Sequence, residues 1–269
     1  MGAKIKEVLR NAIESLRKAN IATADLDALV ILKSLLQKDE VFILTHPEYE
    51  LSKAQEKRFF DLIRKRCTYY PVAYITSKKE FYGFEFFVDE RVLIPRPETE
   101  FVVDAVLEIA GKRKIDVVDV GTGSGCIAIT LSKLLKTCVI ATDISIDALE
   151  VASLNARRLK ADVEFVACPC LDAVCGKFDV VVSNPPYIAA DEFESLAPDV
   201  KREPKIALVC EDAMGVVECI HKGARKMANW LVLEISPQIA AAVRQLDGFV
   251  KTIRDYSSNE RVALFRFGT

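Results

Sequence analysis

Apolar residues recur along this chain with two different periods. Up to about residue 70 they recur every three or four positions, which is typical of amphipathic helices. This spacing predicts one helix over 4–18, a second that Thr23 or Asp25 caps, and a third that opens at Leu51-Ser52. We expect these helices to form a small bundle with short connections.

From residue 116 onward, short apolar runs alternate with helical segments. The runs predict seven strands, at 116–120, 138–142, 163–167, 179–184, 230–235, 248–254 and 261–267. Helices are expected near 125–136, 146–159, 212–228 and 237–246. Such alternation indicates a mostly parallel sheet covered on both faces, the Rossmann-like α/β class. Since no helix separates the last two strands, they should pair antiparallel at one end of the sheet.

Between these regions lies an aromatic-rich stretch, 80–88, followed by the apolar run 91–94. Together they predict a β-hairpin that links two domains. Two prolines then break the chain before helical spacing resumes over 98–110. We therefore predict a helical domain over 1–72, a hairpin linker over 73–95 and a seven-stranded α/β domain over 96–269.

Composition limits the possible classes of protein. The chain has 269 residues, of which 51% are hydrophobic, and a net charge of −2. Its slight basic excess before residue 70 and acidic excess afterwards do not suit a dedicated duplex-DNA binder. No apolar run approaches the ~20 residues of a membrane span, and the amino terminus lacks an apolar signal segment. We expect a cytoplasmic protein that contacts neither a membrane nor nucleic acid directly.

The eight cysteines show no spacing that is typical of a metal site. No pair has Cys-x-x-Cys spacing, and the two histidines lie far from the cysteines clustered at 168–175. We therefore expect reduced, mostly buried thiols and no metal. With only two scattered histidines, a histidine-based acid/base mechanism is disfavoured.

A glycine-rich turn follows the predicted strand 116–120 and opens the next helix. Its candidate cofactor-binding residues are Asp119, Gly121, Thr122, Gly123, Ser124 and Gly125. The dinucleotide pattern would require a further glycine where this chain has Cys126. Asp143 ends the next strand, where it could accept both ribose hydroxyls. A carboxylate before the turn could face a cation, so the set fits S-adenosyl-L-methionine, a nucleoside with a sulfonium charge and no pyrophosphate.

A stiff loop, Asn184-Pro185-Pro186-Tyr187, follows the fourth apolar strand. Two prolines fix the backbone and leave carbonyl groups facing outward. The Asn184 side-chain oxygen and the Pro185 carbonyl could each accept one N–H of a planar NH2 group, against the flat face of Tyr187. These acceptors would favour a pyramidal amide nitrogen in the transition state. No strong base is needed, since a methylated amide nitrogen readily loses its proton.

The position of this loop supports the assignment. In an open α/β sheet, ligands bind beyond the carboxyl ends of the strands. The glycine turn, Asp143 and Asn184 all follow such ends, so they should converge on one crevice. Asn184 is therefore a candidate for cofactor contact as well as for catalysis with Pro185 and Tyr187, and residues 184–187 are candidates for substrate binding.

Five stretches of the chain resemble the release-factor glutamine methyltransferases. They are Glu80-Phe81-Tyr82-Gly83, Leu93-Ile94-Pro95-Arg96-Pro97-Glu98-Thr99-Glu100, Asp119 to Gly125, Ser183 to Tyr187, and Arg202-Glu203-Pro204. The resemblance implies an S-adenosylmethionine-dependent enzyme that methylates N5 of the glutamine in the Gly-Gly-Gln loop of peptide-chain release factors, leaving S-adenosyl-L-homocysteine. It also implies that the helical domain and the hairpin grip the release factor, and that a loop over 188–207 shapes the mouth of the pocket. We expect a monomer.

Three positions depart from the family pattern. Ser77 and Ser236 stand where the family often has glycine, and 167–171 replaces a turn that commonly carries a polar or acidic residue near the adenine. The adenine contact is therefore expected to be apolar. None of the three departures touches the Asn-Pro-Pro-Tyr loop.

Two alternative functions remain open from the sequence. Adenine-N6 and cytosine-N4 methyltransferases share the Asn-Pro-Pro-Tyr motif, and a flipped base could stack on Tyr187. A non-catalytic protein that binds the cofactor and tethers a translation factor is the second alternative. The acidic carboxyl-terminal region argues against the first, and the complete motif argues against the second.

Overall fold

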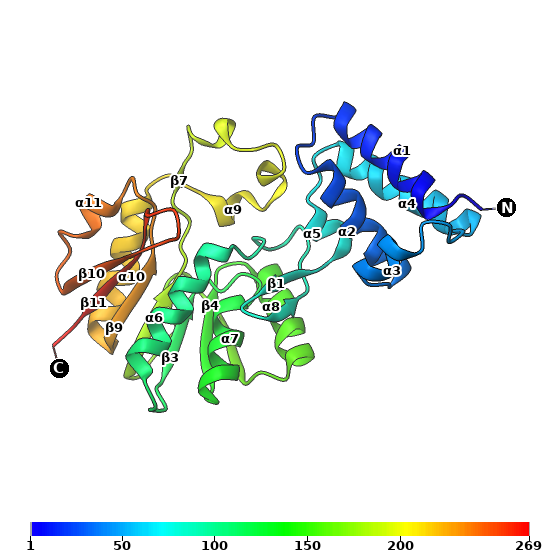
Figure 1. Cartoon of the computed structure of the whole chain (residues 1–269). Helices are drawn as coiled ribbons and strands as arrows, with labels where there is room; N and C mark the ends of the chain where they lie inside the picture. Colours follow the sequence, from blue (N-terminus) through cyan, green and yellow to red (C-terminus); the bar gives the residue numbers. More distant parts are fainter. Residues whose placement is uncertain (1, 269) are drawn as a thin grey trace. The chain divides into compact units, whose positions relative to one another are not determined.

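The computed structural model describes residues 2–268, and its chain divides into two compact units (Figure 1). The first unit is Met1–Ser77 together with the short segment Ala197–Arg202. The second unit is Lys78–Leu196 together with Glu203–Thr269. The chain therefore passes from one unit to the other three times.

The first unit is helical. Its helices are α1 (Ile5–Lys18), α2 (Ala24–Leu36), α3 (Glu40–Thr45), α4 (Lys53–Cys67) and α5 (Val72–Thr76), and the 3-10 turn η3 (Val200–Arg202) packs with them. The three long helices were predicted, whereas the periodicity did not indicate α3 and α5. Ser52 caps α4 by accepting from the Gln55 N–H. Thr23 stands at the N-cap position of α2, but its side chain makes no capping hydrogen bond.

A buried ion pair lies inside this bundle. Arg66 on α4 donates from Nε to Asp27 Oδ2 on α2 at 2.7 Å, and both side chains are less than a tenth exposed. The Arg66 guanidinium also lies 3.7 Å from the Asp199 carboxylate. Arg202 donates to the Thr68 carbonyl at 3.0 Å. The segment Ala197–Arg202 is thus held to α4 and its end by charged groups.

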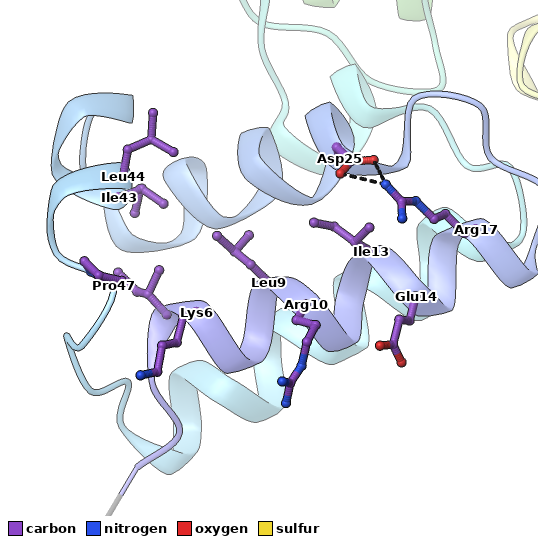
Figure 2. A pocket seen from close by; sticks show the side chains of 11 residues that line it. Lys6, Leu9, Arg10, Ile13, Glu14, Arg17, Asp25, Ile43, Leu44 and Pro47 are labelled. Carbon is purple, nitrogen blue, oxygen red and sulfur yellow. Dashed lines mark hydrogen bonds and ion pairs between the residues drawn. The ribbon is translucent and has the colours of Figure 1, made fainter.

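A groove of about 440 Å³ opens on the surface of the helical unit (Figure 2). Its apolar floor comes from Leu9 and Ile13 on α1 and from Ile43 and Leu44 on α3. Charged side chains form the rim, and Arg17 pairs there with Asp25. Leu44 is 63% exposed.

A seven-stranded sheet forms the centre of the second unit. Its strands are β3 (Val117–Val120), β4 (Val139–Asp143), β5 (Val163–Ala167), β6 (Phe178–Ser183), β9 (Ala228–Glu234), β10 (Phe249–Arg254) and β11 (Glu260–Arg266). Their order is β10-β11-β9-β6-β3-β4-β5. The five strands from β9 to β5 run parallel, and β11 pairs antiparallel with both β9 and β10. This confirms the predicted Rossmann-like sheet and its antiparallel end.

Helices cover both faces of this sheet. The helices of the second unit are α6 (Glu100–Ala110), α7 (Cys126–Leu135), α8 (Ile146–Leu159), α9 (Lys205–Leu208), α10 (Ala213–Met227) and α11 (Ala240–Val243). One apolar core joins α6, α7 and α8 to one face, and a second core joins α10 and α11 to the other (Figure 1). Among residues 2–268, no helix has both the length and the apolar character of a membrane span.

The hairpin is shorter than the sequence indicated. It pairs β1 (Lys79–Phe81) with β2 (Phe84–Phe86), and the predicted arm over 91–94 is not a strand. Tyr82 and Gly83 form its two-residue turn with φ values of 52° and 76°, the left-handed pair that a tight hairpin requires. Ser77, which ends α5, also has a positive φ of 55°. That backbone conformation explains why glycine suits position 77.

Two other predicted elements also differ in the structure. The helix expected over 237–246 keeps only the four residues of α11, because most hydrogen bonds at its two ends span three residues instead of four. The loop expected over 188–207 contains β7 (Ile188–Ala189), which pairs with β8 (Val209–Cys210). It also contains the turns η2 (Phe193–Ser195) and η3, and the start of α9.

Candidate active site

Three loops meet at the point where the strand order reverses. From β3 the chain first adds β4 and β5 on one side, and then places β6 on the other side of β3. The glycine turn follows β3, Asp143 ends β4, and Asn184 follows β6. Because the carboxyl ends of these parallel strands share one edge, ligands of open α/β sheets bind in the crevice there.

A cavity of about 360 Å³ lies at this edge, and its walls are mainly apolar. Predicted site residues that line it are Gly121, Gly123, Asp143, Asn184, Pro185 and Pro186. The segment Cys168-Pro169-Cys170 contributes further apolar wall, together with Ile144 and Val92. The structure thus brings the glycine turn, Asp143 and the Asn-Pro-Pro loop together.

The backbone of the glycine turn is already hydrogen-bonded within the protein. The N–H groups of Gly121 and Thr122 both donate to the Thr142 carbonyl, and Gly125 N–H donates to the Thr122 carbonyl. Gly123 N–H donates to Asp143 Oδ2 at 2.9 Å. A phosphate-binding turn needs free N–H groups that point at the anion. This turn instead offers open space, since nothing lies within 4 Å of a Cβ built at Gly121 or Gly123.

Asp119 holds the glycine turn and the start of α7 in place through hydrogen bonds. Its side chain is completely buried, and Oδ2 accepts from the Thr122 hydroxyl at 2.6 Å and the Ala128 N–H at 3.2 Å. Burial raises the pKa of Asp119 to about 7. Asp119 does not line the cavity, and neither do Thr122, Ser124 and Gly125. Direct contact between these four residues and a cofactor stays a prediction.

Asp143 stands at the cavity wall with a fixed carboxylate. Oδ2 accepts from the Gly123 N–H, and Oδ1 accepts from the Ser145 N–H, both at 2.9 Å. Each carboxylate oxygen has a second lone pair. Asp143 therefore retains the capacity to accept two further hydrogen bonds from a ligand in the cavity.

The Asn184 side chain is held at one end. Its Nδ2 donates to the Thr99 hydroxyl at 3.2 Å, and Thr99 ends the turn η1 (Pro97–Thr99) just before α6. The other end of the amide, Oδ1, is a hydrogen-bond acceptor. Sequence reasoning did not single out Thr99 as a site residue, although it lies in the Pro-Arg-Pro-Glu-Thr-Glu run that carries the family resemblance.

Tyr187 lies on a different wall from the rest of its motif. It lines a second cavity of about 500 Å³, together with Ile188, Ser236, Gln238, Asn259 and Arg261. Burial raises the pKa of the Tyr187 phenol to about 12. Near neutral pH the phenol therefore stays protonated and cannot act as a base. The loop 184–187 therefore borders both cavities: Pro186 lines the first and Tyr187 lines the second.

Two buried glutamates lie close to these loops, and sequence reasoning assigned neither of them a role. Glu203 accepts from the Ile94 N–H at 2.9 Å and from the Arg96 guanidinium at 2.5 Å. It thereby fixes the segment that continues Val92 and Leu93 along the cavity wall. Glu234 ends β9 and is 1% exposed. A carboxylate at the end of a buried strand is the signal that could have identified it.

Three cysteines, Cys168, Cys170 and Cys210, line the first cavity. The Cys210 thiol donates to the Pro186 carbonyl at 3.1 Å and so supports the Asn-Pro-Pro loop. All eight cysteines are free, but only Cys126 and Cys168 are buried, so the expectation of mostly buried thiols was wrong. His221 packs between Phe265 and Phe267 and bonds the Asp247 carbonyl. Among residues 2–268, no group of three or more His, Cys, Asp or Glu side chains could hold a metal.

Solved structures share the fold of this chain. The catalytic domain of hMettl16 in complex with MAT2A 3'UTR hairpin 6 superposes with a TM-score of 0.58 at 14% identity, over 81% of this chain and 83% of that one. The T. thermophilus 16S rRNA methyltransferase RsmC, in complex with AdoMet and guanosine, has a TM-score of 0.53 at 14% identity, over 71% of this chain and 50% of that one. At this identity the likeness shows the fold alone.

Sequence matches cover both units of the chain. Residues 7–76 match the family described as PrmC N-terminal domain, and residues 99–231 match the Methyltransferase small domain. The sheet order, the cavity and these matches define a Rossmann-like methyltransferase.

Relatives over nearly the full length identify the family. A protein of Koribacter versatilis is 39% identical over 251 residues, covering 90% of each chain. One of Clostridium acetobutylicum is 38% identical over 278 residues, covering 97% of this chain and 98% of that one. Both bear the name release factor glutamine methyltransferase. The chain belongs to the release factor glutamine methyltransferase family.

Proposed function

We propose that this protein transfers a methyl group from S-adenosyl-L-methionine to N5 of the glutamine in the Gly-Gly-Gln loop of a peptide-chain release factor. The other product would be S-adenosyl-L-homocysteine. One observation carries the proposal: Asn184 and Pro185 line the same cavity as Gly121 and Gly123 of the glycine turn and Asp143. An amide-binding loop and a nucleoside-sized hollow thus adjoin one another.

The cavity fits the proposed cofactor. The glycine turn has no free N–H at four of its positions, which argues against a pyrophosphate and in favour of a nucleoside without one. Asp143 keeps lone pairs for two ribose hydroxyls, and the apolar wall at Cys168-Pro169-Cys170 suits a purine face. When bound there, S-adenosyl-L-methionine would supply an electrophilic methyl group.

The chain's own residues would hold the glutamine amide. Asn184 Oδ1 and the Pro185 carbonyl would each accept one of its N–H groups from the first cavity. The Tyr187 ring, which lines the second cavity, would hold the plane of the amide from that side. Such orientation can supply roughly 7–11 kcal/mol of the barrier reduction. The acceptors would also polarise the N–H bonds and prepare one proton to leave to Asn184 or to water.

Mass spectrometry of a release factor tests this proposal. After incubation with the protein and S-adenosyl-L-methionine, we expect a gain of one methyl on the loop glutamine. The variant Asn184→Ala should lose turnover by at least about a hundredfold, since preorganised acceptors are worth that much. Its affinity for the cofactor should change little, as measured by calorimetry.

Two results would contradict the proposal. Methylation of DNA or RNA without any on the release factor would indicate a base methyltransferase. Cofactor binding without transfer to any of these substrates would indicate a non-catalytic tether. Full turnover by Asn184→Ala would exclude the role given to that side chain.

We also propose that the helical unit recognises the release factor. The groove between α1 and α3 offers an apolar floor that includes the exposed Leu44, and charged side chains form its rim (Figure 2). An apolar floor with a polar rim is the arrangement found at protein interfaces. The hairpin β1–β2 would add to the same recognition.

A further inference from the structure

Glu234 is a buried carboxylate with no role in the chemistry described so far. It ends β9, which runs parallel to β6 with Ser183 opposite Leu233. The next residues along the two strands, Asn184 and Glu234, therefore stand at corresponding positions. Glu234 is 1% exposed, and its Oε2 has no hydrogen-bond partner within the described chain. A buried, incompletely satisfied charge is costly, and such groups gather at functional sites.

Thr99 links this carboxylate to Asn184. The Thr99 side chain is 1% exposed, and although burial raises the pKa of the Glu234 carboxyl, the interaction of the Thr99 hydroxyl with that carboxylate acts to lower it. The same hydroxyl oxygen accepts from Asn184 Nδ2 at 3.2 Å. The three side chains come from β9, η1 and the loop after β6, so the contact is a tertiary one.

We propose that Glu234, acting through Thr99, is a positioning residue that fixes which end of the Asn184 amide faces the substrate. An ionised carboxylate can only accept, so it takes the single proton of the Thr99 hydroxyl. That hydroxyl can then only accept from Asn184, which turns Nδ2 toward Thr99 and leaves Oδ1 for the substrate amide. This inference rests on the proposed function, in which Oδ1 accepts a glutamine N–H.

The opposite orientation would be unproductive. If Glu234 is protonated, it can donate to Thr99, and Thr99 can then donate to Asn184 Oδ1. The amide would turn over and present its own NH2 to the NH2 of glutamine. Two donors that face each other cannot form a hydrogen bond, so the acceptor that holds the substrate is lost.

The surroundings of Glu234 set the pH at which this change occurs. The charged and titratable groups near it are Arg261 on β11, Arg96 before η1, Glu98 in η1, Tyr187 after β6 and Cys126 on α7. Burial outweighs the two arginines and raises the pKa of Glu234 to about 7. The carboxylate is the active form, so turnover should fall as the pH decreases through about 7.

Three substitutions test the relay in the full-length protein, with a release factor as substrate. Glu234→Gln and Thr99→Val should each lower kcat by about tenfold or more, the usual effect of losing a hydrogen bond to a charged group. Their Kd values for S-adenosyl-L-methionine should stay within about twofold of the wild type. Thr99→Ser keeps the hydroxyl and should restore most of kcat. In Glu234→Gln the acidic decline of turnover near pH 7 should disappear.

The stability of Glu234→Gln separates a positioning role from a purely structural one. If Glu234 served only the fold, the substitution would destabilise the protein. Because folding raises the pKa of Glu234, the folded state binds more protons than the unfolded state between the two pKa values. The contribution of Glu234 to stability therefore falls as pH rises from about 4.5 to about 7. At about pH 8, Glu234→Gln should be at least as stable as the wild type while being less active. Glu260→Gln changes a partly buried carboxylate on β11 that pairs with Arg244 and Thr252 and lines neither cavity. It is the control and should alter neither kcat nor the pH profile.

Several results would overturn this inference. Unchanged kcat in Glu234→Gln, or an acidic decline that persists in it, would do so while leaving the proposed function intact. Loss of activity, cofactor binding and stability together would show that Glu234 serves the fold. Failure of Thr99→Ser to recover activity would exclude the hydroxyl as the link. Absence of transfer by the wild-type protein would overturn the proposed function and the relay with it.

Discussion

Gly125 is the residue at which the site depends most directly on the absence of a side chain. Its φ is +82°, and a Cβ there would stand 2.7 Å from Ile129 Cδ1 and 3.2 Å from Ala152 Cβ. Both neighbours belong to the helices α7 and α8 and are fully buried. The turn and the two helices are therefore packed against bare backbone, whereas Gly123 in the same turn faces open space.

This difference predicts unequal costs for two similar substitutions. Gly125→Ala should destabilise the protein by about 2–4 kcal/mol, from left-handed strain of about 1–2 kcal/mol together with overpacking. Gly123→Ala, with φ +56° and no close neighbour, should cost only the strain. Denaturant unfolding of both variants without cofactor measures the difference. Equal losses would mean that packing against α7 and α8 is not what requires glycine at position 125.

At the scale of elements, Asn155 on α8 joins two segments that the sequence keeps far apart. Its Oδ1 accepts from the Phe87 N–H at 2.8 Å, and its Nδ2 donates to the Phe87 and Ser124 carbonyls, each at 2.9 Å. Asn155 is 1% exposed, so these bonds are shielded from water. One side chain thus ties the segment after the hairpin to the glycine turn.

Asn155→Ala should therefore destabilise the second unit by about 3 kcal/mol or more, because it leaves buried backbone groups without partners. The Phe87 amide should also lose protection in hydrogen exchange. Asn229→Ala is the matched control, since its side chain makes only a 3.5 Å contact to Asp179 and should cost less than about 1 kcal/mol. Similar losses in the two variants would contradict the role given to Asn155.

Elements with a strong local pattern could be predicted from the sequence, and those set by tertiary contacts could not. The strand over 163–167 and the helix over 146–159 lie where the apolar pattern places them. The helix over 237–246 was overestimated because its ends close into tighter turns. The hairpin was misplaced since Tyr82-Gly83 is not a common signature of a two-residue turn. Of the site, the loops were foreseen, but Thr99 and Glu234 meet only in three dimensions.

At the scale of the whole molecule, chemistry and recognition are assigned to separate units. The cavities and their loops lie in the second unit, whereas the groove with Leu44 lies in the helical one. If the helical unit binds the release factor, its substitutions should affect a whole protein substrate and spare a short peptide. A defect in the second unit's cavities should affect both substrates alike.

Leu44→Asp tests this separation. We expect it to raise KM for the release factor by about tenfold, the size of one apolar interface anchor. KM for a short peptide containing Gly-Gly-Gln should not change, because such a peptide needs only the second unit. Val250→Asp places the same charge on an exposed apolar position of β10 and is the control. An unchanged KM for the release factor would place recognition elsewhere.

Because Ala197–Arg202 packs with the helices, no single cut divides the molecule into its two units. A chain cleaved after Ser77 would still hold its pieces together through Asp199 with Arg66 and Arg202 with the Thr68 carbonyl. Conversely, if the helical unit were replaced by that of a relative, its helices would pack against the original segment Ala197–Arg202 unless this segment was replaced as well. Recombination that exchanges recognition between relatives must therefore carry two separate stretches of gene, and a crossover between them would yield a mismatched bundle.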